Sequence, residues 1–330
     1  VAAGGIISLV KNLPLIAKTF RQALKSYGSK GNGDNSRLNK DIPMNIVILT
    51  IGIMAIIMWL VPAVPVSLLG AIIIVIFGFF FATVSSRMVG IVGSSNNPVS
   101  GMAIATLLIT TMILKATGTI GMTGMVASIA IGSVICIIAA IAGDTSQDLK
   151  TGYLVGATPW KQQVGEIIGV AASAIAIGGV LYLLNAAWSY GSSAIPAPQA
   201  TLMKMVVEGV MGGNLPWVLV FAGVGIAVVV EILGIPVLPF AVGLYLPIYL
   251  STPMIVGGLI RLYFDKKKGE SEEEKKRKVE NGVLYSSGLI AGEGLVGILL
   301  AVCAVIPFKG ETFADAFNLS AIFGFSLGNI

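Results

Sequence analysis

Histidine is absent from this sequence of 330 residues. That absence excludes histidine-based metal sites and the serine–histidine and cysteine–histidine arrangements used in nucleophilic catalysis. Cysteine is scarce as well: Cys136 and Cys303 each lie inside an apolar run, where a thiol behaves as a small buried hydrophobic group. We therefore expect no protein-bound metal, no cofactor and no enzymatic activity.

Charged residues are also few in this sequence. Only 11% of the residues are charged and 55% are hydrophobic, with a mean hydropathy of +0.91; a soluble domain has about 25% charged residues. Apolar runs long enough to cross a bilayer, about 18 residues or more, recur along the chain. These features predict an all-α, polytopic transmembrane helical bundle. Its compact loops suit a multi-pass protein of a prokaryotic inner membrane.

The basic residues gather in two segments. Residues 11–41 hold seven basic and two acidic residues, and residues 261–280 hold eight basic and six acidic ones. Loop lysine and arginine mark the cytoplasmic side of a membrane protein, so both segments are predicted to be cytoplasmic loops. The second should form a solvated helix with i,i+4 ion pairs. The net charge of +5 thus needs no nucleic-acid partner.

A count of the apolar segments constrains the topology. Between two cytoplasmic loops the chain must cross the membrane an even number of times. Seven apolar segments lie there: 46–60, 66–81, 99–117, 122–142, 164–184, 217–233 and 238–260. At least one of them does not cross. Segment 99–117 is the expected exception, because it is short and polar at both ends.

A polar stretch, Ser85 to Met102, interrupts the apolar pattern with glycine, serine, asparagine and proline. We expect its backbone to be non-helical, and such backbone survives at membrane depth only where protein or a water-filled cavity satisfies it. It is therefore predicted to be a broken or re-entrant element beside a substrate path. Asn96 and Asn97 could present backbone N–H groups to an anion or form a plain turn and N-cap. Pro98 and Pro247 mark interruptions typical of transporter binding sites.

A second polar stretch, Gly143 to Trp160, carries Asp144 and Asp148 one helical turn apart, on one face if the stretch is helical. The functional interpretation is a patch that binds a charged or zwitterionic substrate or relays a proton. The alternative is a cytoplasmic loop with solvated charges. Ionisable groups at membrane depth cost at least ~2.5 kcal/mol each, so they usually face a cavity or a partner. Glu166 fits this description or lies at the interface, and Glu293 sits deep in its span between two glycines.

These considerations give a set of candidate site residues. Asp144, Glu166 and Glu293 are the candidates for proton coupling. The residues predicted to bind substrate are Ser95, Asn96, Asn97, Asp144, Gln147, Asp148, Tyr153, Gln163 and Tyr245.

Four blocks in one order carry a resemblance to a known family: GSSNNPVSGM ending at Met102, GDTSQDLKTGYLVG from Gly143, GLYLPIYLSTPMIVGGLIR from Gly243, and SSGLIAGEGLVGILLA from Ser286. Together they resemble the oligopeptide transporter family, which includes the yellow-stripe-like metal–chelate carriers. The resemblance implies a proton-coupled importer of oligopeptides or of metal chelates and siderophore-like molecules, built from inverted repeats. Residues 1–330 would form a single transmembrane domain, the C-terminal half of such a transporter.

The resemblance also implies the partners: a small-molecule substrate, protons, the lipid bilayer, and either the N-terminal half of the same transporter or a second copy. In a chelate the substrate's own ligand holds the metal. Two other classes of membrane protein are alternatives. A passive channel for small polar solutes would not need acidic residues buried in its helices. An intramembrane aspartyl protease would need the motif Gly-x-Gly-Asp. Here Ala142, Gly143 and Asp144 fit its last three positions, but Ile141 occupies the position of the first glycine.

Overall fold

The computed structural model describes residues 37–62, 65–92, 99–213, 217–246, 248–266, 271–308 and 311–312, with a few single positions before residue 22. The chain forms two compact units. The first comprises Val1–Val170 and Gln199–Leu244, and the second comprises Ala171–Pro198 and Tyr245–Ile330. Each unit is described by itself below.

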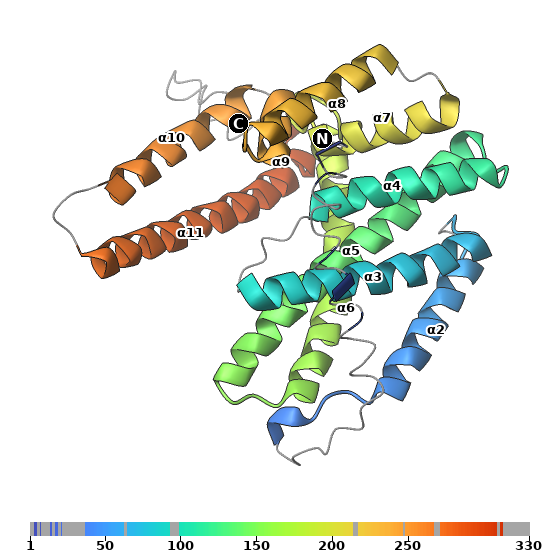
Figure 1. The fold of residues 1–330 in the computed structure, drawn as a ribbon, viewed down its shortest axis with the longest axis horizontal. Coiled ribbons are helices and arrows are strands. Elements are labelled where there is room, and N and C mark those ends of the chain that lie inside the picture. Colours follow the sequence, from blue (N-terminus) through green and yellow to red (C-terminus); the bar gives the residue numbers. More distant parts are fainter. Residues whose placement is uncertain are drawn as a thin grey trace. The chain divides into compact units, whose positions relative to one another are not determined.

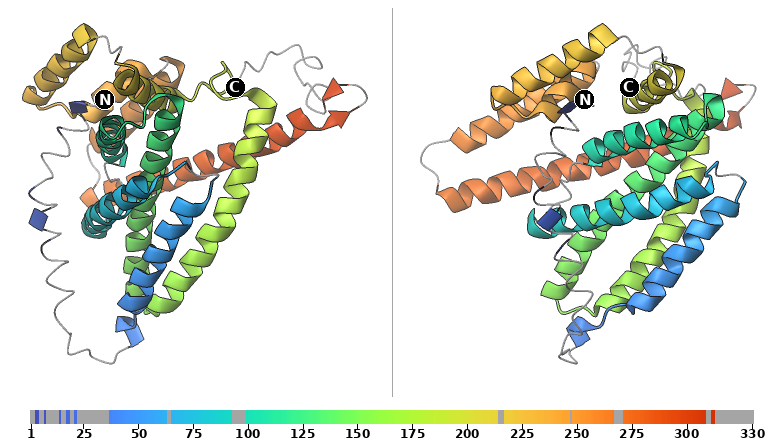
Figure 2. Two further views of the ribbon diagram at one scale, coloured as in Figure 1. Left: turned by 90° about the vertical axis from the view of Figure 1, so that its right-hand side faces the viewer. Right: turned by 45° about the vertical axis from the view of Figure 1, so that its right-hand side comes forward.

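The described part of the chain is almost entirely helical (Figures 1 and 2), as predicted. Its elements, in chain order, are η1 (Arg37–Asn39), α2 (Met44–Leu60), α3 (Leu68–Val92), α4 (Val99–Ala116), α5 (Gly121–Leu154), α6 (Pro159–Trp188), α7 (Pro198–Gly212), α8 (Trp217–Ile232), α9 (Val237–Tyr245), α10 (Ile248–Lys266), α11 (Glu272–Val305), and the short antiparallel strands β1 (Pro307–Phe308) and β2 (Glu311–Thr312).

Four helices are long and apolar enough to cross a membrane, counting only described residues: α3, α5, α6 and α11. Helices α2 and α8 and most of α4 are apolar but shorter. Many large hydrophobic side chains on these helices are exposed, as expected where lipid replaces water as the solvent. The chain is a multi-pass integral membrane protein.

The core of the first unit is built by α3, α4, α5 and α7. Its fully buried side chains include Ile74 and Phe81 of α3, Leu114 of α4 and Ile131 of α5. Glycine lets these helices approach closely. At Gly132, for example, an added Cβ would lie 2.6 Å from Leu107 Cδ2.

The directions of these helices follow from which residues meet. Along α3, Gly70 lies against Ile131, Gly78 against Ile138 and Gly90 against Ser146. The positions on α5 rise with those on α3, so the two helices run in parallel. Helix α4 runs antiparallel to α5. Leu107, within α4, lies against Gly132, whereas Thr119, just after the end of α4, lies against Gly124, closer to the start of α5. Figures 1 and 2 show α3 and α4 side by side with opposite directions.

Both ends of the polar stretch from Ser85 are helical, where we expected non-helical backbone. Residues 85–92 continue α3, and residues 99–102 are the first turn of α4; residues 93–98 lie outside the described residues. For residues 85–92 the expectation was wrong because the small polar residues serve helix packing. Ser85 Oγ donates a hydrogen bond to the carbonyl oxygen of Ala139, and Ser146 Oγ donates to that of Ser86 at 2.7 Å.

Helix α4 runs antiparallel to α3 and α5 and is shorter than both. Its threonines bond within the helix: Thr106 Oγ1 and Thr111 Oγ1 donate to the carbonyl oxygens of Met102 and Leu107, one turn earlier. Its apolar part, Met102–Ala116, is not among the described helices long enough to span. That segment 99–117 does not cross stays a prediction.

Helix α7 is amphipathic. Met203, Val207 and Met211 recur every four residues and pack on the core. On the outer side Lys204 Nζ lies 3.7 Å from Glu208 Oε1, with both side chains exposed. The end of α7 is held by Lys115 of α4, whose Nζ donates to the carbonyl oxygen of Val210 at 2.7 Å. A cation is favourable there because the last carbonyls of a helix lack partners within it.

The charged segment 261–280 is divided between two helices of the second unit. Helix α10 ends at Lys266 and α11 begins at Glu272. A capping box formed by Ser271 and Glu274 starts α11. The predicted one-turn ion pairs are present: Arg261 with Asp265 at 3.0 Å and Lys276 with Glu280 at 4.0 Å.

Candidate functional site

The polar candidates of the first unit gather where α5 ends and α6 begins. Helix α5 ends because Gly156 takes a φ of +76°, and the N–H of Ala157 then bonds the carbonyl oxygen of Gly152 at 2.7 Å. This is a usual glycine-based helix end. Pro159 begins α6, where its missing N–H costs nothing. The turn thus returns the chain beside α5.

Residues 37–42 are hydrogen-bonded to this turn. Arg37 Nη2 donates to the carbonyl oxygen of Gly156 at 2.7 Å, and the N–H of Trp160 donates to that of Lys40 at 2.9 Å. We call these contacts, together with those of Gln163 described next, the inner contact. They place the end of the first basic segment on the same side of the membrane as the α5–α6 turn.

Gln163, a predicted substrate ligand, takes part in the inner contact. Its Oε1 accepts a hydrogen bond from the N–H of Ile42 at 3.1 Å, and its Nε2 donates to Asp41 Oδ1 at 3.4 Å. Both ends of the amide are therefore engaged by the chain itself. Gln163 acts as a positioning residue for the segment before α2.

Three acidic residues lie near one another across α5 and α6. Asp144 and Asp148 are exposed on α5, one turn apart in a continuous helix. Glu166 of α6 is close enough to Thr145 and Asp148 to interact with both. Its Oε1 is shielded from solvent and has no hydrogen-bond partner among the described residues. We call Asp144, Thr145, Asp148 and Glu166 the acidic patch.

The helices carrying the acidic patch approach closely at its inner end. A Cβ on Gly152 would lie 2.0 Å from Gln162 Oε1. Of the other predicted ligands on α5, Gln147 is half-buried and Tyr153 is exposed. Glu166 lies seven residues into α6 and Asp148 six before the end of α5, so both are about 9–11 Å from the turn along the helix axes. The patch therefore lies about two helical turns from the α5–α6 turn, on the side of the inner contact.

The remaining candidates are not brought into this patch by the described structure. Ser95, Asn96 and Asn97 lie outside the described residues. Tyr245 and Glu293 belong to the second unit. Tyr245 is the last residue of α9, and Glu293 is exposed on α11 between Gly292 and Gly294, neither of which has another atom near its Cβ position.

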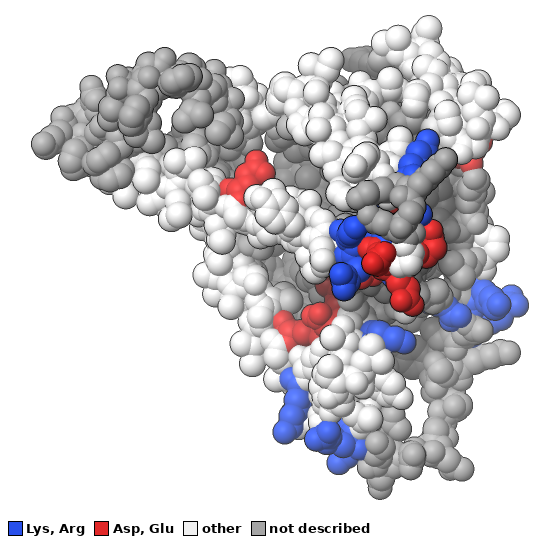
Figure 3. Space-filling model, turned by 90° about the vertical axis from the view of Figure 1, so that its left-hand side faces the viewer, with Lys and Arg blue, Asp and Glu red and all other residues white. Residues whose placement is uncertain are grey.

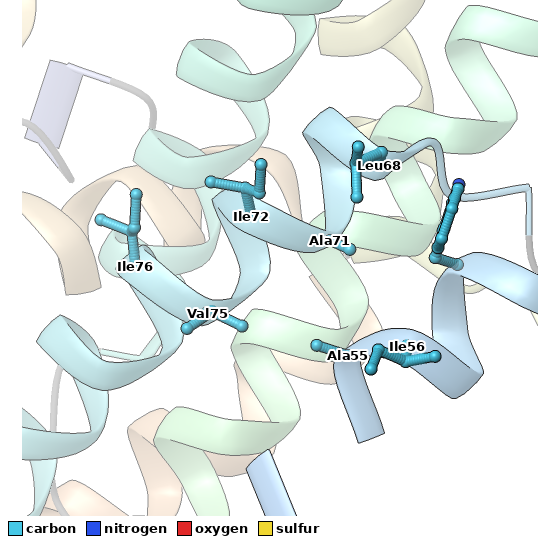
Figure 4. Close-up of a pocket in the computed structure, with 8 residues that line it drawn as sticks. Ala55, Ile56, Leu68, Ala71, Ile72, Val75 and Ile76 are labelled. Atoms are coloured by element: carbon cyan, nitrogen blue, oxygen red, sulfur yellow. The ribbon is translucent and has the colours of Figure 1, made fainter. Parts of the chain in front are cut away.

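An apolar hollow between α2 and α3 is of a different kind. It encloses about 210 Å³ and is lined by Ala55, Ile56, Trp59, Leu68, Ala71, Ile72, Val75 and Ile76 (Figure 4). Apart from the indole nitrogen of Trp59 these side chains offer no polar atom, so the hollow does not suit a charged substrate. In the face shown in Figure 3, uncharged residues cover most of the described surface and charged ones form small groups.

Metal ligands are not assembled in the part of the chain that the structure describes. There, no group of three or more histidine, cysteine, aspartate or glutamate side chains is placed to hold an ion. The acidic patch supplies three carboxyl groups and a hydroxyl. This set can bind an ammonium or other cationic group and can exchange protons.

Sequence reasoning missed Thr145, Arg37 and Asp41 as members of these clusters. Thr145 stands next to the predicted residue Asp144, and Asp41 accepts a hydrogen bond from the predicted residue Gln163. The contacts join residues more than one hundred positions apart, such as Arg37 and Gly156. No periodicity or spacing in the sequence signals such a pairing.

Comparison with known proteins adds to this geometry. No solved structure matches the chain. It is 34% identical over 281 residues to a protein of Haemophilus influenzae whose name assigns it to oligopeptide transport, covering 74% of this chain and 44% of that protein. It is 30% identical over 231 residues to YSL5 of Arabidopsis thaliana and 30% identical over 206 residues to YSL10 of Oryza sativa, both named as metal–nicotianamine transporters. These matches cover 63% and 56% of this chain and 31% and 29% of the relatives.

The chain thus spans less than half the length of these relatives. The family model described as OPT oligopeptide transporter protein matches residues 2–304, nearly the whole chain. That match runs through both units and includes every candidate site residue, and it confirms the resemblance carried by the four sequence blocks. With its multi-pass helical fold and this match over nearly its whole length, the chain belongs to the OPT family of oligopeptide transporters, a family of carriers and not of enzymes.

Proposed function

We propose that this chain is the C-terminal half of a proton-coupled importer of oligopeptides or metal chelates. Support for the substrate class comes from the names of the relatives, which refer to oligopeptides and to metal–nicotianamine complexes. Support for a half-transporter comes from the lengths, since the chain covers 44% of the Haemophilus influenzae protein. The N-terminal half of the same transporter, or a second copy, would complete the path.

The observation that carries the proton-coupling part is the position of Glu166. Its Oε1 is shielded from solvent without a hydrogen-bond partner in the described structure, and Asp148 lies nearby on the facing helix. A carboxyl group in such surroundings can take up and release a proton when a neighbour moves or a ligand arrives. Coupled transport requires a group of this kind, whereas passive flow does not.

The acidic patch also suits the proposed substrates. A peptide carries an ammonium group at its N-terminus, and carboxylates bind such a group by charge-assisted hydrogen bonds. Asp144 and Asp148 are exposed and free to approach a ligand from α5. In a chelate the metal would arrive with its own ligands, as cargo. Asp144, Gln147, Asp148 and Tyr153 are the proposed contacts on this wall, and Ser95, Asn96, Asn97 and Tyr245 are proposed as further contacts.

The proposal is tested by uptake into proteoliposomes that contain the full-length protein. A labelled oligopeptide and a metal–nicotianamine complex are offered separately, with an imposed pH gradient and after the gradient is collapsed with a protonophore. We expect accumulation of at least one substrate above its external concentration, and only while the gradient is present.

Two other outcomes bear on the proposal. Equilibration of the substrate without accumulation, unchanged by the protonophore, would indicate a passive channel and overturn proton coupling. Accumulation that follows a sodium gradient instead would identify a different coupling ion. Protein-free liposomes provide the background.

A further inference from the structure

Helices α5 and α6 run antiparallel from the turn that joins them, and their facing residues follow a regular order. Next to the turn, Gly152 lies against Gln162. Asp148 lies four residues before Gly152 and Glu166 four residues after Gln162, so this pair faces each other one helical turn further on. Thr145 lies three residues before Asp148, on the same face of α5. This order agrees with the contacts of Glu166, which interacts with both Thr145 and Asp148.

The rotation of α5 about its own axis is fixed by its contact with α3. Ser146 Oγ donates to the carbonyl oxygen of Ser86 at 2.7 Å, and Gly90 of α3 lies against the same serine. Consecutive residues of a helix point in directions about 100° apart. Because Ser146 faces α3, the preceding residue, Thr145, is turned away from α3 and toward α6.

The hydroxyl of Thr145 is used differently from other hydroxyls of the same helix. Ser128 Oγ and Thr151 Oγ1 each donate to a carbonyl oxygen four residues earlier in α5. Such a bond is common for serine and threonine inside helices. The Thr145 hydroxyl instead lies within hydrogen-bonding reach of the Glu166 carboxyl. It therefore serves the facing helix rather than its own.

Acidic groups approach Glu166 from the elements beside it. Asp148 faces it from α5, and its charge acts on Glu166. Asp144, also on α5, is exposed one turn further from the α5–α6 turn. In the inner contact, Asp41 accepts a hydrogen bond from Gln163, one turn before Glu166. Each of these carboxylates disfavours a negative charge on Glu166, because like charges repel.

Two basic residues of the same region are directed elsewhere. Arg37 donates to a carbonyl oxygen of the α5–α6 turn, and Lys161 Nζ lies 5.8 Å from the centroid of the Trp160 ring. The Thr145 hydroxyl is thus the group on the facing helix that favours a negative charge on Glu166, because a donor to a carboxylate stabilises its charged form.

We propose that Thr145 is the positioning residue of Glu166, and that Thr145 and Asp148 act on its carboxyl group in opposite senses. The hydroxyl donates to the ionised carboxylate and can rotate to accept from the protonated carboxyl, so it holds the group in place while a proton is taken up and released. Asp148 disfavours the ionised form by its charge. This inference rests on the proposed function, in which Glu166 is the proton-coupling group.

The test follows the protonation of Glu166 in the purified full-length protein by infrared difference spectroscopy over a range of pH. A protonated-carboxyl band that the unmodified protein shows and Glu166→Gln lacks belongs to Glu166. Thr145→Val removes the hydroxyl and keeps the shape of the side chain, whereas Thr145→Ser keeps the hydroxyl. Thr151→Val is the matched control, because its hydroxyl bonds its own helix.

We expect Thr145→Val to raise the pH at which this band is half lost by about 0.5–1 unit, because losing the donor favours the protonated form. Asp148→Asn should lower it, because a repelling charge is removed. Thr145→Ser and Thr151→Val should leave it unchanged. If Thr145→Val does not accumulate, Thr145→Ala replaces it.

An unchanged midpoint in Thr145→Val would overturn the proposal. An equal shift in Thr145→Ser would also overturn it, because the hydroxyl would then not be the cause. The titration needs no transport. A failure of the proposed function would therefore appear separately, as uptake that ignores the pH gradient while the band of Glu166 still titrates as expected.

Discussion

Gln163 illustrates how the residues around the α5–α6 turn divide their tasks. Its amide bonds Ile42 and Asp41 and so cannot serve a ligand without releasing them. Glu166, one turn further along α6, has an oxygen without such a partner in the described structure. Two polar residues of similar appearance in the sequence thus have different roles, one in positioning and one in the proposed chemistry.

A substitution at Gln163 separates these roles. Gln163→Ala removes both hydrogen bonds to residues 41–42, each worth about 0.5–1.5 kcal/mol. We expect faster proteolysis of the segment before α2 in inside-out vesicles, with the KM for the transported substrate changed less than twofold. A large rise in KM with unchanged proteolysis would show that Gln163 contacts the substrate. Gln147→Ala, on the predicted substrate wall, provides the comparison.

At the scale of elements, small residues decide how the helices of the first unit meet. Ser85, Gly90 and Ser146 bring α3 against α5, and Gly132 admits Leu107 of α4. Gly124 lies against backbone, because a Cβ there would lie 2.4 Å from the carbonyl oxygen of Thr119 and 3.0 Å from Met211 Cε. Backbone cannot yield as a flexible side chain can.

Gly124→Ala should therefore destabilise the protein. We expect a loss of about 1–3 kcal/mol from overpacking, seen as a lower midpoint in a thermal unfolding series followed by size-exclusion chromatography in detergent. The matched control is Gly169→Ala in α6, where nothing lies within 4 Å of the added Cβ. That control should keep or raise the midpoint, because alanine favours a helix by about 1 kcal/mol over glycine. Equal midpoints for the two variants would contradict the close packing at Gly124.

For the molecule as a whole, some features could be predicted from the sequence and others could not. Composition was sufficient for a multi-pass helical protein, and the cytoplasmic position of the charged segments stays a prediction. The path of the chain was not predictable from spacing alone. Pro253 lies inside a continuous α10, whereas α9 ends and α10 begins on either side of Pro247, and nothing local in the sequence distinguishes the two prolines.

The acidic patch was predictable only in part, for a similar reason. Asp144 and Asp148 share a face by their spacing, which the sequence shows directly. Their proximity to Glu166 depends on the glycine-based turn at Gly156, which returns α6 beside α5. Thr145 was not predicted, because a threonine hydroxyl indicates a binding site only when its neighbour on α6 is known.

The central claim is that Glu166 couples substrate movement to protons, and Glu166→Gln tests it most directly. Proteoliposomes containing this variant are assayed for substrate exchange at equal pH and for accumulation driven by a pH gradient. The control is Glu208→Gln, whose carboxylate pairs with exposed Lys204. We predict that Glu166→Gln retains exchange within about threefold of the unmodified protein but loses gradient-driven accumulation, while the control retains both. Accumulation by Glu166→Gln at the level of the unmodified protein, or equal loss of exchange and accumulation, would contradict the account.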